Sequence, residues 1–312
     1  METKIKLLAL LCILSANMSF AANAVALVDD AVASIETIEA NEAIEAIVPF
    51  DQKLALSLSG KYNIGIFQQQ ADAYRTDKPW DIGFGIRYKN IAAGAYIPIT
   101  LKSDSFDIAV NFYLRKMYYE IFFKRYDNFY LDNGEETLAH KNTGLDIMSS
   151  GIMAGWIHNY KNHSLRSVFT LSEKQTVSSG SFLYGFGVFY TSIRFNSLIN
   201  YFPQNETMTR YNERQHIVYF GPTAGYSYTW ILPHDIFLNV GIITGANLGV
   251  TINDVKLVFV PQINPKITFG HHNASWSINA VMGCNTSILL WDKDNFDIVV
   301  PATMSVTFSK RF

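Results

Sequence analysis

The sequence is poor in cysteine and has no excess of charge of either sign. Cys12 lies in a segment that we expect to be removed, so Cys284 would stand alone, without a disulfide or a cysteine metal cluster. A lipid anchor at Cys12 is disfavoured because the large Leu11 precedes it. The 25 basic and 27 acidic residues give a net charge of −2, and this balance argues against a nucleic-acid partner, which requires a basic surface.

Long apolar runs are also absent. Beyond the N-terminal segment, no stretch approaches the roughly 18 apolar residues that a membrane-spanning helix requires. The N-terminal segment itself has the pattern of a secretory signal, with Lys4 and Lys6, an apolar stretch at 7–14, and small residues before the expected cleavage. We therefore expect residues 1–22 to be a signal peptide and the mature chain to be exported.

From Lys53 onward, apolar and polar residues alternate with a period of two, the pattern of a β-strand with one apolar face. Several of these stretches exceed the roughly 5 to 6 residues usual in soluble strands and reach the roughly 9 to 11 that a tilted membrane-crossing strand needs. The stretches are 53–67, 81–89, 91–100, 105–114, 117–125, 144–157, 164–172, 182–195, 215–230, 235–250, 257–270, 274–288 and 297–311. The fold predicted for residues 53–312 is an all-β, antiparallel transmembrane β-barrel of the outer-membrane type.

The number of predicted strands is odd, whereas a single-chain bacterial barrel needs an even number. Residues 126–143 and 191–214 read mainly as long polar loops but are the places where a strand could be hidden. We predict about 12 strands, with 10 to 14 as the range left open, because the mature chain divides into hairpins of that size. The 14% of aromatic residues suits two interfacial girdles of such a barrel.

The last stretch of the chain resembles the C-terminal insertion signal of outer-membrane barrels. One of its faces is apolar and ends in Phe308 and Phe312, and the other carries hydroxyl groups and Arg311. Lys310 departs from the expected pattern of apolar residues at alternate positions. We expect this strand to be recognised by the barrel-assembly machinery and to close the barrel by pairing with the strand near Lys53.

The lengths of the predicted connections give the barrel an orientation. Short connections are typical of periplasmic turns and long polar ones of extracellular loops. The short ones include 89–90, 115–116, 232–234 and 270–273, and the long ones are 67–80, 126–143 and 196–214.

Residues 23–52 are acidic and lack basic side chains. Their apolar residues recur at roughly helical spacing before Pro49, so a short amphipathic helix is conceivable. We interpret the segment as a solvated periplasmic linker, with a plug folded back into the barrel as the alternative.

Four segments carry a resemblance to a known family: WDIGFGIRYKNIAAGAYIPI (80–99), WIHNYKNHSLRSVFT (156–170), SSGSFLYGFGVFYTSI (178–193) and GPTAGYSYTWILPHDIFLNV (221–240). Their glycine-aromatic strand ends and turns resemble an uncharacterised family of bacterial outer-membrane β-barrels known only as a domain of unknown function. The resemblance covers most of residues 53–312. It implies a barrel in the bacterial outer membrane and no established catalytic residues.

The sequence contains no nucleophile elbow, zinc-protease motif or phosphate loop. His271 and His272 are adjacent, so on a strand they would point to opposite faces and could not share a metal. An outer-membrane phospholipase would need a serine and a histidine on neighbouring strand ends, and no such local motif is present. We therefore expect no catalytic residue, cofactor or metal, and a lipid-modifying enzyme is the least favoured function.

Charged residues that alternate with apolar ones are expected to point into the barrel lumen. They are Lys61, Arg87, Asp107, Glu120, Lys124, Arg166, Arg194 and Lys266. Charges of both signs more often form a salt-bridged interior than a selective pore, and a 12-strand barrel lies between filled and open sizes. The favoured function is a narrow channel, transporter or binder of a small solute in the outer membrane. The alternatives are a structural or surface-interaction (adhesin-like) barrel and a secreted soluble β-sandwich, and the oligomeric state stays undetermined.

Overall fold

The computed structural model describes nine segments of the chain: residues 46–69, 72–76, 80–99, 105–127, 129–131, 145–195, 214–253, 255–290 and 296–312. The predicted signal peptide and the acidic segment up to residue 45 lie outside the described residues. No helix in these segments is long and apolar enough to span a membrane.

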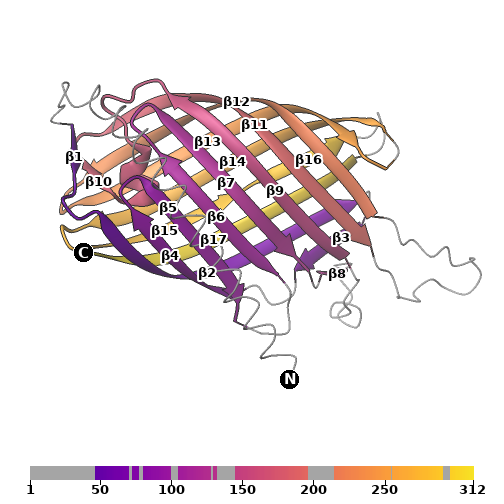
Figure 1. Cartoon of the computed structure of the whole chain (residues 1–312), viewed down its shortest axis with the longest axis horizontal. Coiled ribbons are helices and arrows are strands. Elements are labelled where there is room, and N and C mark those ends of the chain that lie inside the picture. The colour runs from indigo at the N-terminus through magenta and orange to yellow at the C-terminus, as the bar shows by residue number, and fades with distance from the viewer. Residues whose placement is uncertain are drawn as a thin grey trace, which may run out of the picture. The chain divides into compact units, whose positions relative to one another are not determined.

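The described chain forms a closed antiparallel barrel of twelve strands (Figure 1). Its strand segments are β2 (Leu54–Gln69), β3 (Asp72–Thr76), β4 (Trp80–Tyr88), β5 (Ile91–Pro98), β6 (Phe106–Tyr113), β7 (Met117–Tyr126), β8 (Phe129–Leu131), β9 (Leu145–Ile157), β11 (Ser179–Phe195), β12 (Arg214–Leu232), β13 (Ile236–Thr251), β14 (Leu257–His272), β15 (Trp276–Cys284), β16 (Thr286–Leu290) and β17 (Phe296–Arg311). β15 and β16 follow one another between β14 and β17 and act as one strand. The short β3 and β8 extend the sheet beside β2.

The C-terminal strand closes the barrel, as the sequence predicts. β17 pairs with β2 from Asp297↔Gln69 to Arg311↔Ala55, so the last strand lies against the first one along its whole length. Phe308 and Phe312 are exposed on the outer surface, and Lys310 shares this face. Their role as an insertion signal stays a prediction.

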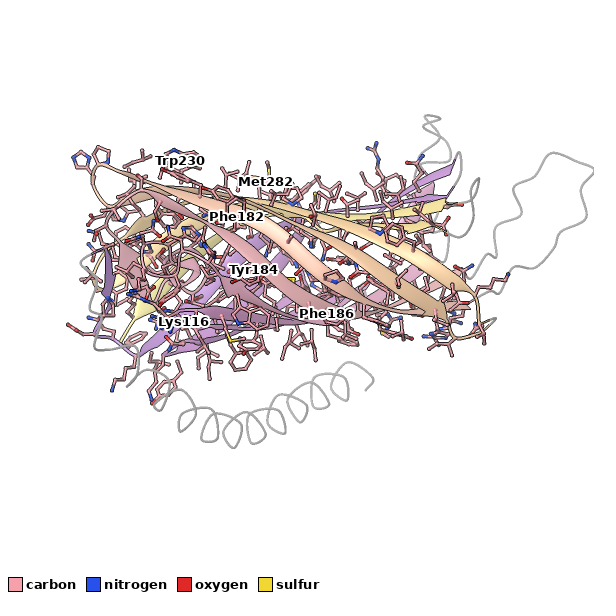
Figure 2. The ribbon with its side chains drawn as sticks, turned by 90° about the horizontal axis from the view of Figure 1, so that it is seen from above. Lys116, Phe182, Tyr184, Phe186, Trp230 and Met282 are labelled. Carbon is pink, nitrogen blue, oxygen red and sulfur yellow. The ribbon has the colours of Figure 1, made fainter. Side chains whose placement is uncertain are left out.

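Alternation gives the barrel an apolar outside and a more polar inside. On β11, Phe182 is 65% exposed whereas the next residue, Leu183, is 3% exposed, because successive side chains point to opposite faces of a strand. Phe182, Tyr184, Phe186 and Met282 are exposed on the outer surface (Figure 2). An apolar surface of this extent suits contact with lipid rather than water.

The two ends of the barrel differ in their connections. Short turns follow β4, β6, β12 and β14 at one end, which we call the turn end, and Lys89, His234 and Asp235 adopt positive φ angles of 50° to 61° in them. The C-terminus lies at this end as well (Figure 1). The long connections leave from the other end, the loop end, and residues 132–144 and 196–213 lie outside the described residues.

One predicted strand is wrong. Residues 164–172 contain a short π-helix, η2 (Arg166–Thr170), followed by β10 (Glu173–Gln175), which pairs with β1 (Ile47–Pro49) outside the barrel sheet. Leu165, Val168 and Phe169 stand at helical spacing and bury one side of this turn, so the segment packs as a helix. We call residues 158–178, which connect β9 to β11 at the turn end, the turn-end insertion. Removing the wrong strand from the predicted thirteen leaves the twelve that are observed.

Candidate functional site

The inward-facing side chains enclose a chamber of about 350 Å³. Its wall is formed by β4 to β7 on one side and by β14, β15, β17 and β2 on the other. Phe169 and Leu171 of the turn-end insertion line it at one end, and Phe122 and Phe189 line it towards the other. Six of the eight predicted lumen charges line this chamber: Lys61, Arg87, Asp107, Glu120, Lys124 and Lys266.

Four strands, β2, β4, β6 and β7, bring three of these interior charges together with Asp81. The Lys61 ammonium lies 2.9 Å from Asp107 and 3.2 Å from Asp81, and the Lys124 ammonium lies 3.5 Å from Asp107. The Lys61 ammonium also lies 4.1 Å from the centre of the Tyr96 ring. A buried charge is tolerated when it is paired and hydrogen-bonded, and this network meets that condition.

A second ion pair crosses the lumen. Glu120 on β7 accepts a hydrogen bond of 2.5 Å from Tyr113 and lies 3.6 Å from the ammonium of Lys266 on β14. These two strands are not neighbours in the sheet, so the pair joins opposite parts of the wall. Arg87 differs, since its guanidinium donates to backbone carbonyls of Lys53 and Lys89 at 3.5 and 3.2 Å.

Apart from Lys266, the wall formed by β14, β15 and β17 is neutral and mostly polar. Hydroxyl groups bridge β2 and β17, with Ser57 and Ser309 at 2.8 Å and Ser59 and Thr307 also at 2.8 Å. The amide oxygens of three asparagines on this wall are buried and have no hydrogen-bond partner among the described residues. They belong to Asn264, Asn279 and Asn285.

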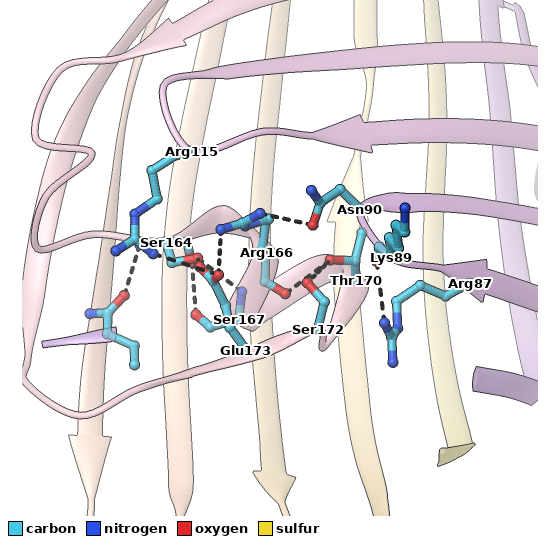
Figure 3. A network of polar contacts seen from close by, with 11 residues as sticks. Arg87, Lys89, Asn90, Arg115, Ser164, Arg166, Ser167, Thr170, Ser172 and Glu173 are labelled. Atoms are coloured by element: carbon cyan, nitrogen blue, oxygen red, sulfur yellow. Dashed lines mark hydrogen bonds and ion pairs between the residues drawn. The ribbon is translucent and has the colours of Figure 1, made fainter. Parts of the chain in front are cut away.

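The turn-end insertion is held by a polar network centred on Glu173, which is 1% exposed (Figure 3). Its carboxylate lies 2.7 Å from the Arg166 guanidinium and 3.6 Å from that of Arg115, and it accepts a hydrogen bond from Ser164. Arg166 also donates to the Asn90 side chain at 2.8 Å. Because Asn90 and Arg115 belong to turns of the barrel, the network fastens the insertion to the barrel rim.

The insertion makes apolar and backbone contacts with the barrel as well. Leu165 packs with side chains of β6, β7, β9 and β11, and Val168 is fully buried beside Phe237. Arg311 of β17 donates to the Leu171 carbonyl at 3.0 Å and to the Trp276 carbonyl at 2.8 Å. These contacts fill the turn end of the barrel.

Apolar side chains narrow the loop end. We call this group the loop-end cluster: Phe67, Tyr126, Phe129, Leu145, Ile147, Phe189, Ile193, Ile217, Tyr219, Val258, Val260 and Leu289. The cavity beside it is only about 30 Å³, which is room for one or two water molecules. Among the described residues, the loop end is therefore closed to a solute.

Two predicted lumen charges lie elsewhere. Arg166 points into the polar network of the insertion, not from a strand into the chamber. The predicted lumen position of Arg194 is wrong. Thr191 and Ile193 point into the barrel, so Arg194, the next residue after Ile193, lies on the outer face of β11. Near the loop end the usual arrangement of an apolar outer face and a polar lumen is reversed. There the loop-end cluster makes the lumen apolar, and polar residues such as Arg194 face outward.

His163, His271 and His272 lie in three different surroundings and do not share a site. His271 stacks on Trp276 and His272 on Phe237, and they point to opposite faces of β14, as predicted. His163 lies in the insertion outside the membrane-crossing strands, and its burial lowers the pKa of the imidazole to about 4. No group of three metal-binding side chains forms within the described segments.

Sequence reasoning missed Glu173, Arg115 and the group of three chamber asparagines, Asn264, Asn279 and Asn285, which we call the asparagine wall. Glu173 could have been found, because Leu165, Val168 and Phe169 at helical spacing indicate that residues 164–172 leave the sheet. Arg311 was placed on the polar face, but its contact with Leu171, which is 140 residues away, has no local signal.

Comparison with known proteins gives relatives of low similarity. The solved structures include the NanC porin, with 8% identity, 82% of this chain and 100% of that chain covered, and a TM-score of 0.31. The outer-membrane protease OmpT from Escherichia coli has 7% identity, coverage of 86% and 98%, and a TM-score of 0.31. An outer-membrane channel from Pseudomonas putida F1 has 9% identity, coverage of 85% and 97%, and the same TM-score of 0.31.

No match was found among curated proteins. A family model does match, over residues 55–305, which include nearly the whole barrel. The resemblance noted in the glycine-aromatic segments is thereby confirmed. The chain belongs to the family described as Domain of unknown function (DUF4421).

Proposed function

We propose that this protein is a gated outer-membrane barrel that binds a small solute in its chamber and passes it when the turn-end insertion moves. The observation that carries the proposal is the chamber of about 350 Å³, lined by polar and charged groups and blocked at the turn end by a separate segment of chain. Small-molecule sites usually occupy roughly 300–1,000 Å³. A barrel interior that served only as packing would not need this space.

The apolar outer surface supports a location in the outer membrane, where lipid would cover Phe182, Phe186 and their neighbours. The expected signal peptide and the terminal strand fit export and recognition by the barrel-assembly machinery. By the lengths of the connections, the turn end would face the periplasm. The insertion would then be a periplasmic gate.

Side chains of the described residues narrow the lumen in two places. The Glu120–Lys266 pair crosses the lumen and the loop-end cluster narrows it. Barrels of eight strands are filled by side chains and those of sixteen leave an aqueous channel, so twelve strands suit a lumen that opens only after a rearrangement. Release of the insertion uncovers the turn end, and smaller shifts of the loop-end side chains complete the path.

Conductance in planar bilayers tests this function. We expect the intact protein to be closed most of the time, and a variant with residues 160–177 replaced by a short glycine-serine turn to show stable open events. Folding of both proteins is checked by heat-modifiable migration on gels. A variant that folds but stays as closed as the intact protein contradicts the proposal.

A structural or surface-interaction barrel is the second candidate, and the loop-end cluster favours it. Twelve apolar and aromatic side chains fill the interior below the long connections, as a rigid support for binding loops would require. In this case, shortening residues 132–144 and 196–213 should abolish binding to envelope or host surfaces while membrane insertion is kept. Unchanged surface binding counts against this candidate.

A further inference from the structure

The chamber has an uneven distribution of polar groups that bears on its ligand. Most charged side chains gather on β2, β4, β6 and β7, whereas β14, β15 and β17, apart from Lys266, present amides and hydroxyls. We infer that the chamber takes a small, neutral, hydroxyl-rich solute of about the size of a monosaccharide. The inference rests on the proposed function and names the class of solute that this function handles.

The charged groups argue for a neutral ligand because they already have partners. Lys61 and Lys124 share Asp107, and Lys266 faces Glu120 within 3.6 Å. A charged solute would compete with one member of a pair and leave the other member buried without a counter-charge, which is unfavourable. A neutral solute leaves each pair intact.

Arg87 is the chamber cation for which no described carboxylate lies within salt-bridge distance. Its guanidinium is held by three backbone carbonyls, those of Gln52, Lys53 and Lys89. Arg87 lines the chamber, and its Nε is buried without a hydrogen-bond partner among the described residues, so one donor of this side chain is unused. A hydroxyl oxygen of a sugar can accept from this group without disturbing the carbonyl contacts.

The asparagine wall supplies the complementary acceptors. Asn264 and Asn285 lie opposite one another between the registered pairs Ile263↔Thr286 and Lys266↔Gly283, and both belong to the chamber lining. Their amide oxygens are buried without a partner in the described part of the chain. Buried acceptors normally have a donor, and a pair of ligand hydroxyls would supply one to each.

The remaining lining also suits a sugar. Thr303 and Ser305 continue the hydroxyl row along β17, and Phe122 and Phe169 present aromatic surfaces at the two ends of the chamber. A sugar ring combines hydroxyl edges with apolar C–H faces, so it can use both kinds of surface. A small apolar solute would leave the amide pair unsatisfied.

Two glycines provide a variant that fills the chamber and a matched control that does not. Gly94 faces the chamber, and a Cβ added there meets only the Phe84 carbonyl oxygen at 3.6 Å. Gly60 faces the lipid side, and a Cβ added there meets nothing within 4 Å. Gly94→Trp therefore fills the chamber, and Gly60→Trp adds the same side chain outside it.

The test is calorimetric binding to the detergent-purified full chain with three sugars of similar size: glucose, glucuronate and glucosamine. We expect glucose to bind at least tenfold more tightly than the acid or the amine. Asn264→Leu and Asn285→Leu should each weaken glucose binding about tenfold, Gly94→Trp should abolish it, and Gly60→Trp should leave it unchanged. Heat-modifiable migration verifies that each variant is folded.

If glucuronate or glucosamine binds more tightly than glucose and Gly94→Trp still blocks this binding, the inference of a neutral solute is overturned. The proposed function then stands. Absence of binding by all three sugars, together with conductance in the insertion-replaced variant, also overturns the class alone. Absence of both binding and conductance overturns the proposed function as well. Glucose binding that is insensitive to Asn264→Leu, Asn285→Leu and Gly94→Trp places the site elsewhere and overturns the inference.

Discussion

The two ends of the barrel are closed in different ways. At the turn end, a separate segment is held by Glu173, Arg166 and Arg311 through directional polar contacts. At the loop end, the strands themselves contribute a packed apolar cluster. The insertion also buries Leu165 and Val168, but all of its contacts come from one short segment that can leave as a unit. The loop-end cluster can open only if several strands move or many side chains change rotamer.

The difference supports the turn end as the place of the proposed gate. Loss of the insertion contacts leaves all twelve strands paired, so the barrel survives while its turn end opens. Loss of the cluster removes packing that holds neighbouring strands together. We therefore expect changes at the loop end to alter global stability and changes at the turn end to alter local opening.

Phe67→Ala should have the largest effect. Phe67 is fully buried in the loop-end cluster, and truncating a buried phenylalanine costs about 3–5 kcal/mol through lost burial and the cavity that remains. Denaturant unfolding in detergent micelles measures this loss. Hydrogen exchange of the turn-end insertion should stay unchanged, and a large increase there would show that the two ends are coupled.

Glu173→Gln should have a smaller and more local effect. The substitution keeps the shape but removes the charge that faces Arg166 and Arg115, and hydrogen bonds to charged groups contribute roughly 1.5–3 kcal/mol. We expect faster hydrogen exchange in residues 158–178 and more frequent channel openings, with nearly unchanged global unfolding. Equal exchange in variant and intact protein would show that apolar contacts alone hold the insertion.

Lowering the pH should loosen the insertion through His163. Burial lowers its pKa from 6.5 to about 4, so the folded insertion holds the imidazole neutral while the released one can bind a proton. The stabilisation is complete above pH 6.5 and is lost as the pH falls towards 4, by about 2 kcal/mol at pH 5. Hydrogen exchange between pH 7 and 5 measures it, and a His163→Phe variant with the same pH response would exclude His163 as the cause.

Asp146→Ala should have the smallest effect. Asp146 forms a bidentate ion pair with Arg125 on the outer face near the loop end. Arg125 donates hydrogen bonds of 3.1 and 2.7 Å to the two carboxylate oxygens. Both side chains are partly exposed, and ion pairs at a protein surface contribute about 0–1 kcal/mol. The temperature at which the band shifts on a heat-modifiability gel should therefore barely change, and a change comparable to that of Phe67→Ala would contradict the contrast between inside and outside.

Much of the fold follows from local patterns. The inward and outward side chains of β2, β11 and β17 can be predicted from the sequence, because alternation depends only on the pleat of the strand. The same reasoning places Lys61, Asp107 and the other chamber charges inside. It fails for Arg194, because near the loop end the lumen is apolar and the outer face is polar, which reverses the assumption behind the assignment.

Other parts of the site could not be predicted. The Glu120–Lys266 pair depends on how far the strands are staggered around the barrel, and no short stretch of sequence specifies this. The unpartnered oxygens of Asn264 and Asn285 become apparent only when all neighbours are known. The helical spacing of Leu165, Val168 and Phe169 is a local signal for the insertion, but alternating strands on both sides of it predict a strand there as well.

Arg311 links the closure of the barrel wall to the turn-end insertion. It lies in β17, the strand that pairs with β2, and from there it donates to the carbonyl of Leu171 in the insertion. A nascent chain that lacks β17 has neither the strand that closes against β2 nor the guanidinium that fastens the insertion. A single strand therefore both completes the barrel wall and fastens the segment that covers its turn end.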